Sequence, residues 1–217
     1  MKKLSFSKKN LSFEDLQHIV DIEEKIDFSQ FSDWFNFGYH ISNDTTKFLN
    51  QLIDKNRLFF DDYLEEELKA KFLIPILNRI DFVTNDCRDW YERPLKIKLN
   101  NIELSGNADF MVAKGRSKPV VPYFFIQEFK KLLTPSNPKY QLVAQLLVAL
   151  NLNQHQTIKG AFVIGKYWNF VILKKMDNKY VYFVSEDFDS SKITDLEAIY
   201  KHLIFIKHEI KNLSIRE

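Results

Sequence analysis

The strand that decides the fold is the apolar run Tyr123-Phe-Phe-Ile-Gln-Glu128-Phe-Lys130, which carries a carboxylate and an ammonium two residues apart near its end. Residues i and i+2 of a strand share a face, so Glu128 and Lys130 are predicted to lie beside Phe124 and Ile126. Apolar residues fill both faces, which indicates a strand in the middle of a sheet. Charged groups are almost never buried there unless they are paired or bind a metal. The strand therefore predicts a site at its end.

The carboxylate of Asp109 offers a partner for this pair. It follows Ser105-Gly-Asn-Ala108, where Gly106 lets the backbone turn tightly beside the carboxylate. One Asp, one Glu and one Lys on adjacent strands supply hard oxygen ligands for Mg²⁺ and a cation that positions water and offsets phosphate charge. Two simpler interpretations stay open: an E-x-K triplet is commonly a surface ion pair, and an Asp after a glycine turn is commonly a turn cap.

Composition bounds the remaining possibilities. The 217 residues, 45% hydrophobic and 28% charged, predict one folded domain over 1–217 without a linker. A net charge of +2 leaves nucleic-acid binding to local patches. The start of the chain lacks a signal-peptide pattern and no apolar stretch reaches membrane-spanning length, so we expect a cytoplasmic protein without a membrane partner. The single Cys87 excludes an intramolecular disulfide and a Cys-rich zinc site.

Hydrophobic periodicity predicts an α/β fold with a mixed sheet. Helices are expected over 12–26, 46–53, 61–77, 140–150 and 194–211. Strands are expected over 97–99, 102–104, 109–113, 120–130, 160–164, 169–173 and 180–184, with Asn100-Asn101 as a turn. Residues 1–60 then form an N-terminal helical segment, 61–150 hold the candidate site, and 151–217 supply the completing strands and a C-terminal helix.

Gly106-x-x-Asp109, then Glu128-x-Lys130 on an apolar strand, then a helix carrying Gln141 resemble the motifs of the PD-(D/E)XK nuclease superfamily. The resemblance covers 61–150 as motifs and the whole chain in element order. It implies a restriction-endonuclease-like fold, a mixed central sheet flanked by helices, in which Asp109 and Glu128 bind Mg²⁺ with the backbone carbonyl of Phe129 and Lys130 contacts the attacking water. In the family a Pro or an aliphatic residue often precedes the Asp; here it is Ala108, at a position that varies.

Many members of this superfamily add a Glu from an upstream helix, and Glu65-Glu-Glu67 lies on such a helix. The segment through Phe72 and Pro75 resembles the start of the nuclease domain in restriction subunits of type I restriction enzymes. Glu65 shares a helical face with Leu68 and Phe72, so we expect Glu65 to be the auxiliary metal ligand and the next two glutamates to face solvent. A run of glutamates is also commonly a solvated helix face.

The resemblance also gives a role to Gln141. In similar families a Gln on this helix supports the active-site Lys or contacts the phosphate. A polar side chain at the exposed end of a core helix explains it equally well. Gln145 projects from the same side of the helix and receives no role.

Basic residues near the motifs are candidates for contacts with the DNA backbone, since phosphate contacts come chiefly from Lys and Arg. These are Lys131, Lys139, Lys114, Arg116 and Lys118. Lysines of this kind more often serve solubility alone.

The expected function is therefore a Mg²⁺-dependent endonuclease that hydrolyses DNA phosphodiester bonds, with Mn²⁺ able to substitute. The alternative is a catalytically inactive nuclease fold that binds nucleic acid or protein. The sequence also resembles a group of small bacterial proteins, common in Bacteroidetes, that are assigned to the same superfamily and whose substrate is undefined. The sequence contains no Gly-rich phosphate-binding loop, so we expect no nucleotide cofactor. A homodimer would allow double-strand cuts, but nothing in the sequence requires one.

Overall fold

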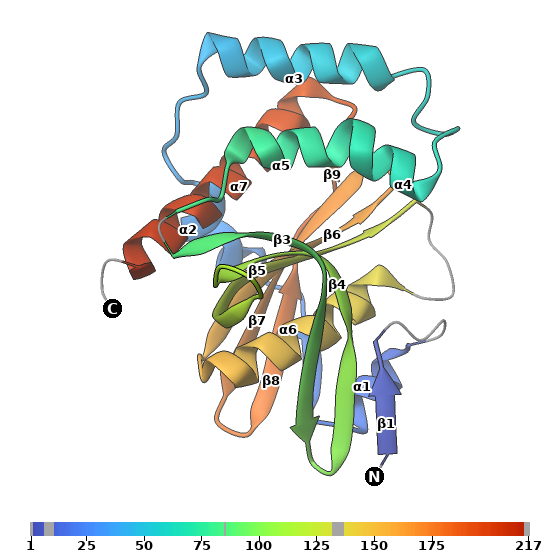
Figure 1. The fold of residues 1–217 in the computed structure, drawn as a ribbon, viewed down its shortest axis with the longest axis vertical. Coiled ribbons are helices and arrows are strands. Elements are labelled where there is room, and N and C mark those ends of the chain that lie inside the picture. Colours follow the sequence, from blue (N-terminus) through green and yellow to red (C-terminus); the bar gives the residue numbers. More distant parts are fainter. Residues whose placement is uncertain (1, 7–10, 85, 132–136, 215–217) are drawn as a thin grey trace.

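A curled mixed sheet flanked by helices organises the chain (Figure 1), which confirms the predicted α/β class. The computed structural model describes residues 2–6, 11–84, 86–131 and 137–214. The strands are β1 Lys2–Ser5, β2 Ile22–Lys25, β3 Cys87–Leu99, β4 Ile102–Lys114, β5 Val120–Lys130, β6 Thr157–Ile164, β7 Tyr167–Met176, β8 Lys179–Val184 and β9 Phe188–Asp189. The helices are α1 Phe13–Gln17, α2 Ser32–Phe35, α3 Asn43–Asn56, α4 Glu65–Leu68, α5 Ile74–Ile80, α6 Pro138–Asn153 and α7 Ile193–Ser214. A 3₁₀ turn, Phe28–Phe31, precedes α2, and a π-helical turn, Lys69–Leu73, joins α4 to α5.

The strand order is β1-β4-β5-β6-β7-β8-β2, with β3 added to β4 and β9 added to β7. β5 and β6 are parallel, as are the pairs β1–β4 and β2–β8, and the other pairs are antiparallel. The parallel step from β5 to β6 needs a crossover, and α6 supplies it. The connection therefore holds α6 against the end of β5.

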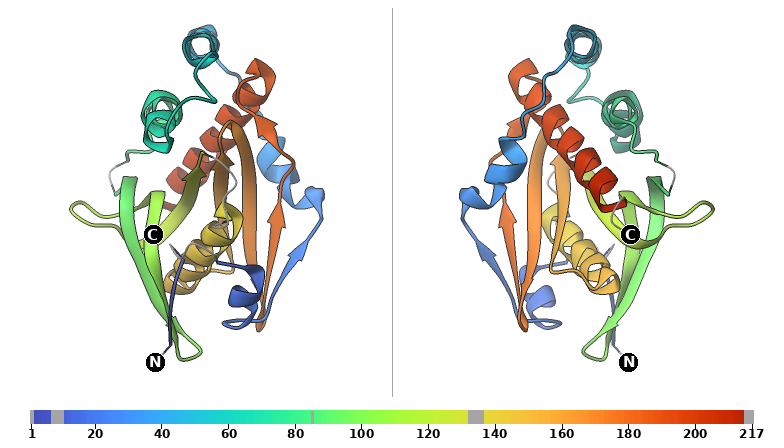
Figure 2. Two further views of the ribbon diagram at one scale, coloured as in Figure 1. Left: turned by 90° about the vertical axis from the view of Figure 1, so that its right-hand side faces the viewer. Right: turned by 90° about the vertical axis from the view of Figure 1, so that its left-hand side faces the viewer.

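Two apolar cores lie on the two faces of the sheet. The sheet curls around α6, with the β3–β4 hairpin on one side of this helix and β7 and β8 on the other (Figure 2). Residues 141–150 of α6 are all buried, as expected for a helix that is apolar nearly all round. The opposite face is covered by α3, α5 and α7, whose side chains pack with Phe110, Phe125 and Phe170.

The edge of β4 that carries the candidate site is interrupted. β3 pairs with β4 along its length, so β1 and β5 must share the other edge. β1 pairs with Ile102 to Ser105, and β5 pairs with Phe110 to Lys114. Between these two ladders, residues 106–109 have no strand partner on that edge in the described part of the chain. Asp109 lies in this gap.

The N-terminal segment differs from the sequence prediction. Ser12 and Asp15 form a capping box, with Asp15 N–H donating to Ser12 Oγ at 3.3 Å, but the helix ends at Gln17 rather than near residue 26. Ile19 and Val20 follow, and β-branched residues lose rotamer freedom in a helix. The chain then enters β2, which pairs with β8. Segment 1–60 thus contributes two sheet strands, β1 and β2, as well as helices.

Other elements are close to expectation. The helix predicted over 46–53 extends from Asn43 to Asn56, because Ser42 caps it by accepting from the N–H of Thr45 at 3.3 Å. The predicted turn at Asn100-Asn101 is present, and both residues have positive φ, 45° and 64°, as a tight hairpin requires. One expected neighbour of Glu128 is wrong: Phe124 packs on the opposite core, beyond the register shift between β4 and β5.

Candidate active site

Asp109 joins β4 to β5 where the two strands separate. Their ladder ends at the pair Phe110 and Gln127, while β5 continues along β6 to Lys130. The backbone N–H of Phe129 has no strand partner on β4, and a buried N–H must find another acceptor. It donates to Asp109 Oδ2 at 2.7 Å. The gap in the ladder therefore fixes this carboxylate against the end of the strand that the sequence singled out.

The ammonium of Lys130 is where the predicted ligands meet. Its Nζ lies 3.0 Å from Glu128 Oε1, 3.6 Å from Glu65 Oε1 and 3.9 Å from Asp109 Oδ2. It also donates to the carbonyl oxygen of Phe129 at 2.8 Å. The four oxygen groups that the sequence indicated as metal ligands thus surround one cationic atom.

Glu65 reaches this cluster from α4. Its Oε2 accepts from the backbone N–H of Lys131 at 3.3 Å, which holds the helix against the end of β5. The side chains of Glu66 and Glu67 are 83% and 44% exposed. Glu65 is therefore the member of the glutamate run that faces the site, as the helical face predicted.

Lys69 is a second cation that the sequence analysis did not identify. Its Nζ lies 3.4 Å from Glu65 Oε1, 3.4 Å from Asp109 Oδ1 and 3.3 Å from Glu66 Oε1. Lys130 contacts the first two of these carboxylates as well. Glu65, Lys69, Asp109 and Lys130 consequently form a ring of alternating charges, which we call the charge ring.

Lys69 lies one helical turn beyond Glu65, because its backbone N–H donates to the Glu65 carbonyl and the two side chains form an i, i+4 ion pair. Lys69 is the first residue of the π-helical turn Lys69–Leu73 between α4 and α5. π turns are rare, and they occur mostly as single-turn bulges that are often found at functional sites. The four-residue spacing from Glu65 was a sequence signal for this contact, whereas helical periodicity does not anticipate the π turn that follows.

Glu92 is a further acidic residue that the sequence analysis missed. It lies on β3 opposite Asp109, between the register pairs Tyr91–Phe110 and Arg93–Ala108. Its φ is 49°, a left-handed conformation that costs a non-glycine residue about 1–2 kcal/mol. The carboxylate lies 3.8 Å from Lys69 Nζ. Burial and the charge of Asp109 raise its pKa.

The two glutamines of α6 exchange the roles expected of them. Gln145 Nε2 donates to Glu128 Oε2 at 2.7 Å and to the carbonyl of Asn107 at 3.2 Å. Gln141 Nε2 instead donates to the carbonyl of Phe6 at 2.9 Å. Our expectation that Gln141 supports the site is therefore corrected in favour of Gln145. The four-residue spacing predicted their common side of the helix, but it could not indicate which turn lies level with Glu128.

The charged groups of the site shift one another's pKa values. Burial and the neighbouring charge of Asp109 raise the pKa of Glu128 to about 7, against the opposing effect of Lys130. Burial alone would lower the pKa of Lys130, but Glu128 and Asp109 outweigh it and raise that pKa. Asp109 and Glu65 likewise raise the pKa of Lys69 despite its burial. Both lysines are thus held charged, while Glu128 is the carboxyl that exchanges a proton near neutral pH.

The donor set fits a hard divalent cation. Carboxylate and carbonyl oxygens are the ligands that Mg²⁺ and Mn²⁺ prefer, and four such groups already converge on the ammonium of Lys130. The described residues contain no group of three His, Cys, Asp or Glu placed to hold a metal ion directly. Ammonium groups stand among the carboxylates instead. A cavity of 220 Å³ beside Asp109 is lined by Lys69, Glu92 and Phe129, among others.

The basic residues expected to contact DNA do not form one group. Lys139 Nζ pairs with Glu24 of β2 at 2.9 Å. Lys131 directly follows β5, and its backbone contacts Glu65. Lys114 ends β4, and Arg116 and Lys118 belong to the β4–β5 connection, so all three lie five or more residues beyond Asp109.

The sequence has no match among protein-family models and none among curated proteins. The described helices include none that is long and apolar enough to cross a membrane. The geometry of the site is therefore the basis on which a function can be proposed.

Proposed function

We propose that this chain is a metal-dependent nuclease of the PD-(D/E)XK type, which hydrolyses DNA phosphodiester bonds in the cytoplasm. The observation that carries the proposal is the convergence of Glu65, Asp109, Glu128 and the Phe129 carbonyl on Lys130. The mixed sheet is consistent with a restriction-endonuclease-like arrangement in which 1–217 acts as one domain. The sequence motifs and the place where β4 and β5 separate support the same proposal.

Each residue has a role that follows from its contacts. Asp109, Glu128 and the Phe129 carbonyl would hold Mg²⁺ or Mn²⁺, with Glu65 as an auxiliary ligand. The bound ion supplies Lewis-acid stabilisation of the phosphate and a more acidic water. Lys130 orients the attacking water and offsets negative charge as the phosphorus becomes five-coordinate. Gln145 orients Glu128 through its 2.7 Å hydrogen bond.

Lys69 complements this arrangement. It touches the Oδ1 side of Asp109, whereas Phe129 and Lys130 touch the Oδ2 side. The second positive charge partly neutralises the carboxylates, which lets an anionic phosphodiester approach an otherwise acidic site.

Plasmid and linear DNA cleavage in Mg²⁺ and in Mn²⁺ tests the function. Asp109→Asn and Lys130→Met should each reduce cleavage by about 10²-fold or more, the effect typical of removing one group that stabilises the transition state. Lys55→Met is the matched control, because Lys55 is an exposed lysine of α3 and lies outside the charge ring. Equal cleavage by the wild type and both site variants, or none with either metal, would reject the proposal.

One observation favours a second function, a catalytically inactive module that binds nucleic acid. Lys69 and Lys130 already pair with the carboxylates that a metal would need. Titration calorimetry with Mn²⁺ separates the two functions. Saturable binding that Asp109→Asn abolishes supports the nuclease; DNA binding without metal binding supports the inactive module.

A further inference from the structure

Two arginines cover a buried indole on β3. The guanidinium carbon of Arg88 lies 4.7 Å from the ring centre of Trp90, and that of Arg93 lies 5.5 Å from it. Trp90 is only 3% exposed, while both arginines are exposed. Stacking on an aromatic face restrains a guanidinium group. Less side-chain entropy is then given up when it binds a ligand.

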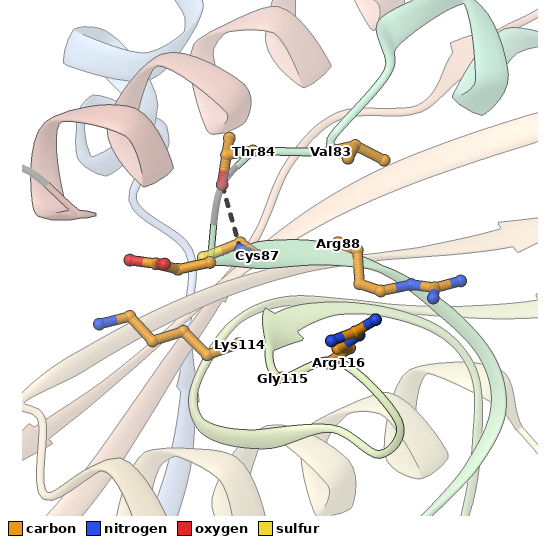
Figure 3. A pocket seen from close by; sticks show the side chains of 8 residues that line it. Val83, Thr84, Cys87, Arg88, Lys114, Gly115 and Arg116 are labelled. Carbon is orange, nitrogen blue, oxygen red and sulfur yellow. Dashed lines mark hydrogen bonds between the residues drawn. The ribbon is translucent and has the colours of Figure 1, made fainter.

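A third arginine, Arg116, lies beside Arg88 just after the end of β4. A cavity of 490 Å³ is lined by Arg88, Lys114, Gly115 and Arg116, among others. Arg88 and Arg116 lie on the same side of this cavity, and Lys114 points to the other side (Figure 3). Gly115 has φ +117° and approaches the Lys118 carbonyl so closely that a Cβ would meet it at 2.1 Å. This position therefore requires glycine, and the tight turn places Arg116 next to β3.

These guanidinium groups have no anionic partner within the protein as described. Arg88, Arg93 and Arg116 form no ion pair with any described carboxylate, whereas Arg79 pairs with Asp44. Arg88 donates only a hydrogen bond, to a backbone carbonyl. An unpaired guanidinium keeps its full capacity for bidentate binding of a phosphate.

Arg88 and Arg93 lie along the β3–β4 hairpin, which also carries Asp109. Arg93 is the register partner of Ala108, the residue before Asp109, and Arg88 is the partner of Ala113. Five strand residues span roughly 17 Å at about 3.4 Å each. That length matches roughly five nucleotides along one DNA strand.

We propose that Arg93, Arg88 and Arg116 form a binding site for the phosphodiester backbone of duplex DNA, on one side of the bond that is cut. This inference rests on the proposed nuclease function for its choice of DNA. It replaces Lys114 and Lys139 with two arginines of β3 as the main phosphate contacts. Phosphate contacts position DNA without reading its sequence, so this site sets the register of cleavage.

Fluorescence anisotropy with a labelled 20-base-pair duplex in EDTA measures binding without cleavage. Arg88→Gln with Arg116→Gln should weaken binding about tenfold and lower the slope of log K against log salt by about 1.8, near 0.9 for each phosphate that is no longer neutralised. Lys47→Gln with Lys55→Gln on α3 removes the same charge elsewhere and should change neither quantity. Arg88→Lys with Arg116→Lys should restore the salt slope, because a lysine still neutralises a phosphate.

The outcomes separate this inference from the nuclease proposal. Equally weakened binding in the α3 control would show a general effect of charge and would overturn the arginine site. Unchanged binding in the Arg88→Gln, Arg116→Gln variant, together with metal-dependent cleavage, overturns the arginine site and leaves the nuclease standing. Arginine-dependent binding by a protein that cuts no DNA supports the site and rejects the nuclease. Tighter arginine-dependent binding to duplex RNA than to DNA overturns the choice of DNA.

Discussion

The charge ring and the surroundings of His202 bury polar groups in opposite ways. In the charge ring, Glu65, Lys69, Asp109 and Lys130 alternate in sign, so each charge is balanced by close neighbours. Around His202 there is no such balance. Both ring nitrogens of His202 lack a hydrogen-bond partner among the described residues. The His202 ring stacks on Phe35 at 3.9 Å.

The difference shows in the proton equilibria. Neighbouring carboxylates raise the pKa of Lys130 against the effect of burial, so this buried group stays charged. Burial lowers the pKa of His202 to about 3, and the adjacent charge of Lys201 adds to the shift. Burial with partners therefore preserves charge that chemistry can use, whereas burial without partners removes it.

Removing Asp109 should disturb the charge ring most. Asp109→Ala leaves the N–H of Phe129 without its acceptor and removes one of the two carboxylates that both lysines share, so we expect the free energy of unfolding to fall by about 3 kcal/mol. Asp109→Asn keeps an acceptor for that N–H and should be destabilised less, yet cleavage should fall to the same extent. Urea denaturation beside plasmid cleavage measures both effects. Equal stability of the two variants would contradict the role given to the Phe129 hydrogen bond.

The pH dependence of the free energy of unfolding tests the effect of burying His202 without partners. A His with a lowered folded-state pKa stabilises the fold above its unfolded value of about 6.5, and this contribution is lost as pH falls from 6.5 towards 3. The loss is about 1.4 kcal/mol per pH unit in that window. His202→Phe should therefore flatten the fall in stability between pH 6.5 and pH 5. Urea titrations at both values measure it, with His155→Phe as the exposed control. Equal slopes in wild type and His202→Phe would show that His202 is not the group responsible.

The sequence predicted the strands of the site better than its surroundings. Strand alternation placed Glu128 and Lys130 on one face. The tight turn expected at Gly106 is wrong, because Gly106 lies within the continuous strand β4, where the missing Cβ leaves room for the Phe6 ring. The structure brings these side chains together with Glu65 because β4 and β5 separate at this point. Chain order and periodicity suffice for such local relations.

Two acidic or basic residues of the site were missed for different reasons. Glu92 has a left-handed conformation in the middle of a strand, which periodicity does not encode. Lys69 was overlooked, although its four-residue spacing from Glu65 indicated the contact. Gln145 lies beside Glu128 because of the axial position of α6, which long-range packing decides. β1 and β2 were missed because their pairing with β4 and β8 joins segments far apart in the chain.

Lys69 gives the finest test of the charge ring. Its ammonium competes with any divalent cation for Glu65 and Asp109, so Lys69→Met should raise the affinity for Mn²⁺ about tenfold, or about 1.4 kcal/mol. Lys71→Met is a matched control, since Lys71 lies two residues on and pairs only with Glu67 among the described carboxylates. Titration calorimetry at fixed pH measures the affinity without requiring catalysis.

The changes in Mn²⁺ affinity and in cleavage rate of Lys69→Met together decide what Lys69 does. Tighter Mn²⁺ binding with slower cleavage means that Lys69 opposes the metal and assists the phosphate. Tighter binding with faster cleavage means that it only restrains the metal. Unchanged binding, equal to that of Lys71→Met, would contradict the competition itself and leave Lys69 as a structural cation whose removal lets Glu65 and Asp109 repel each other.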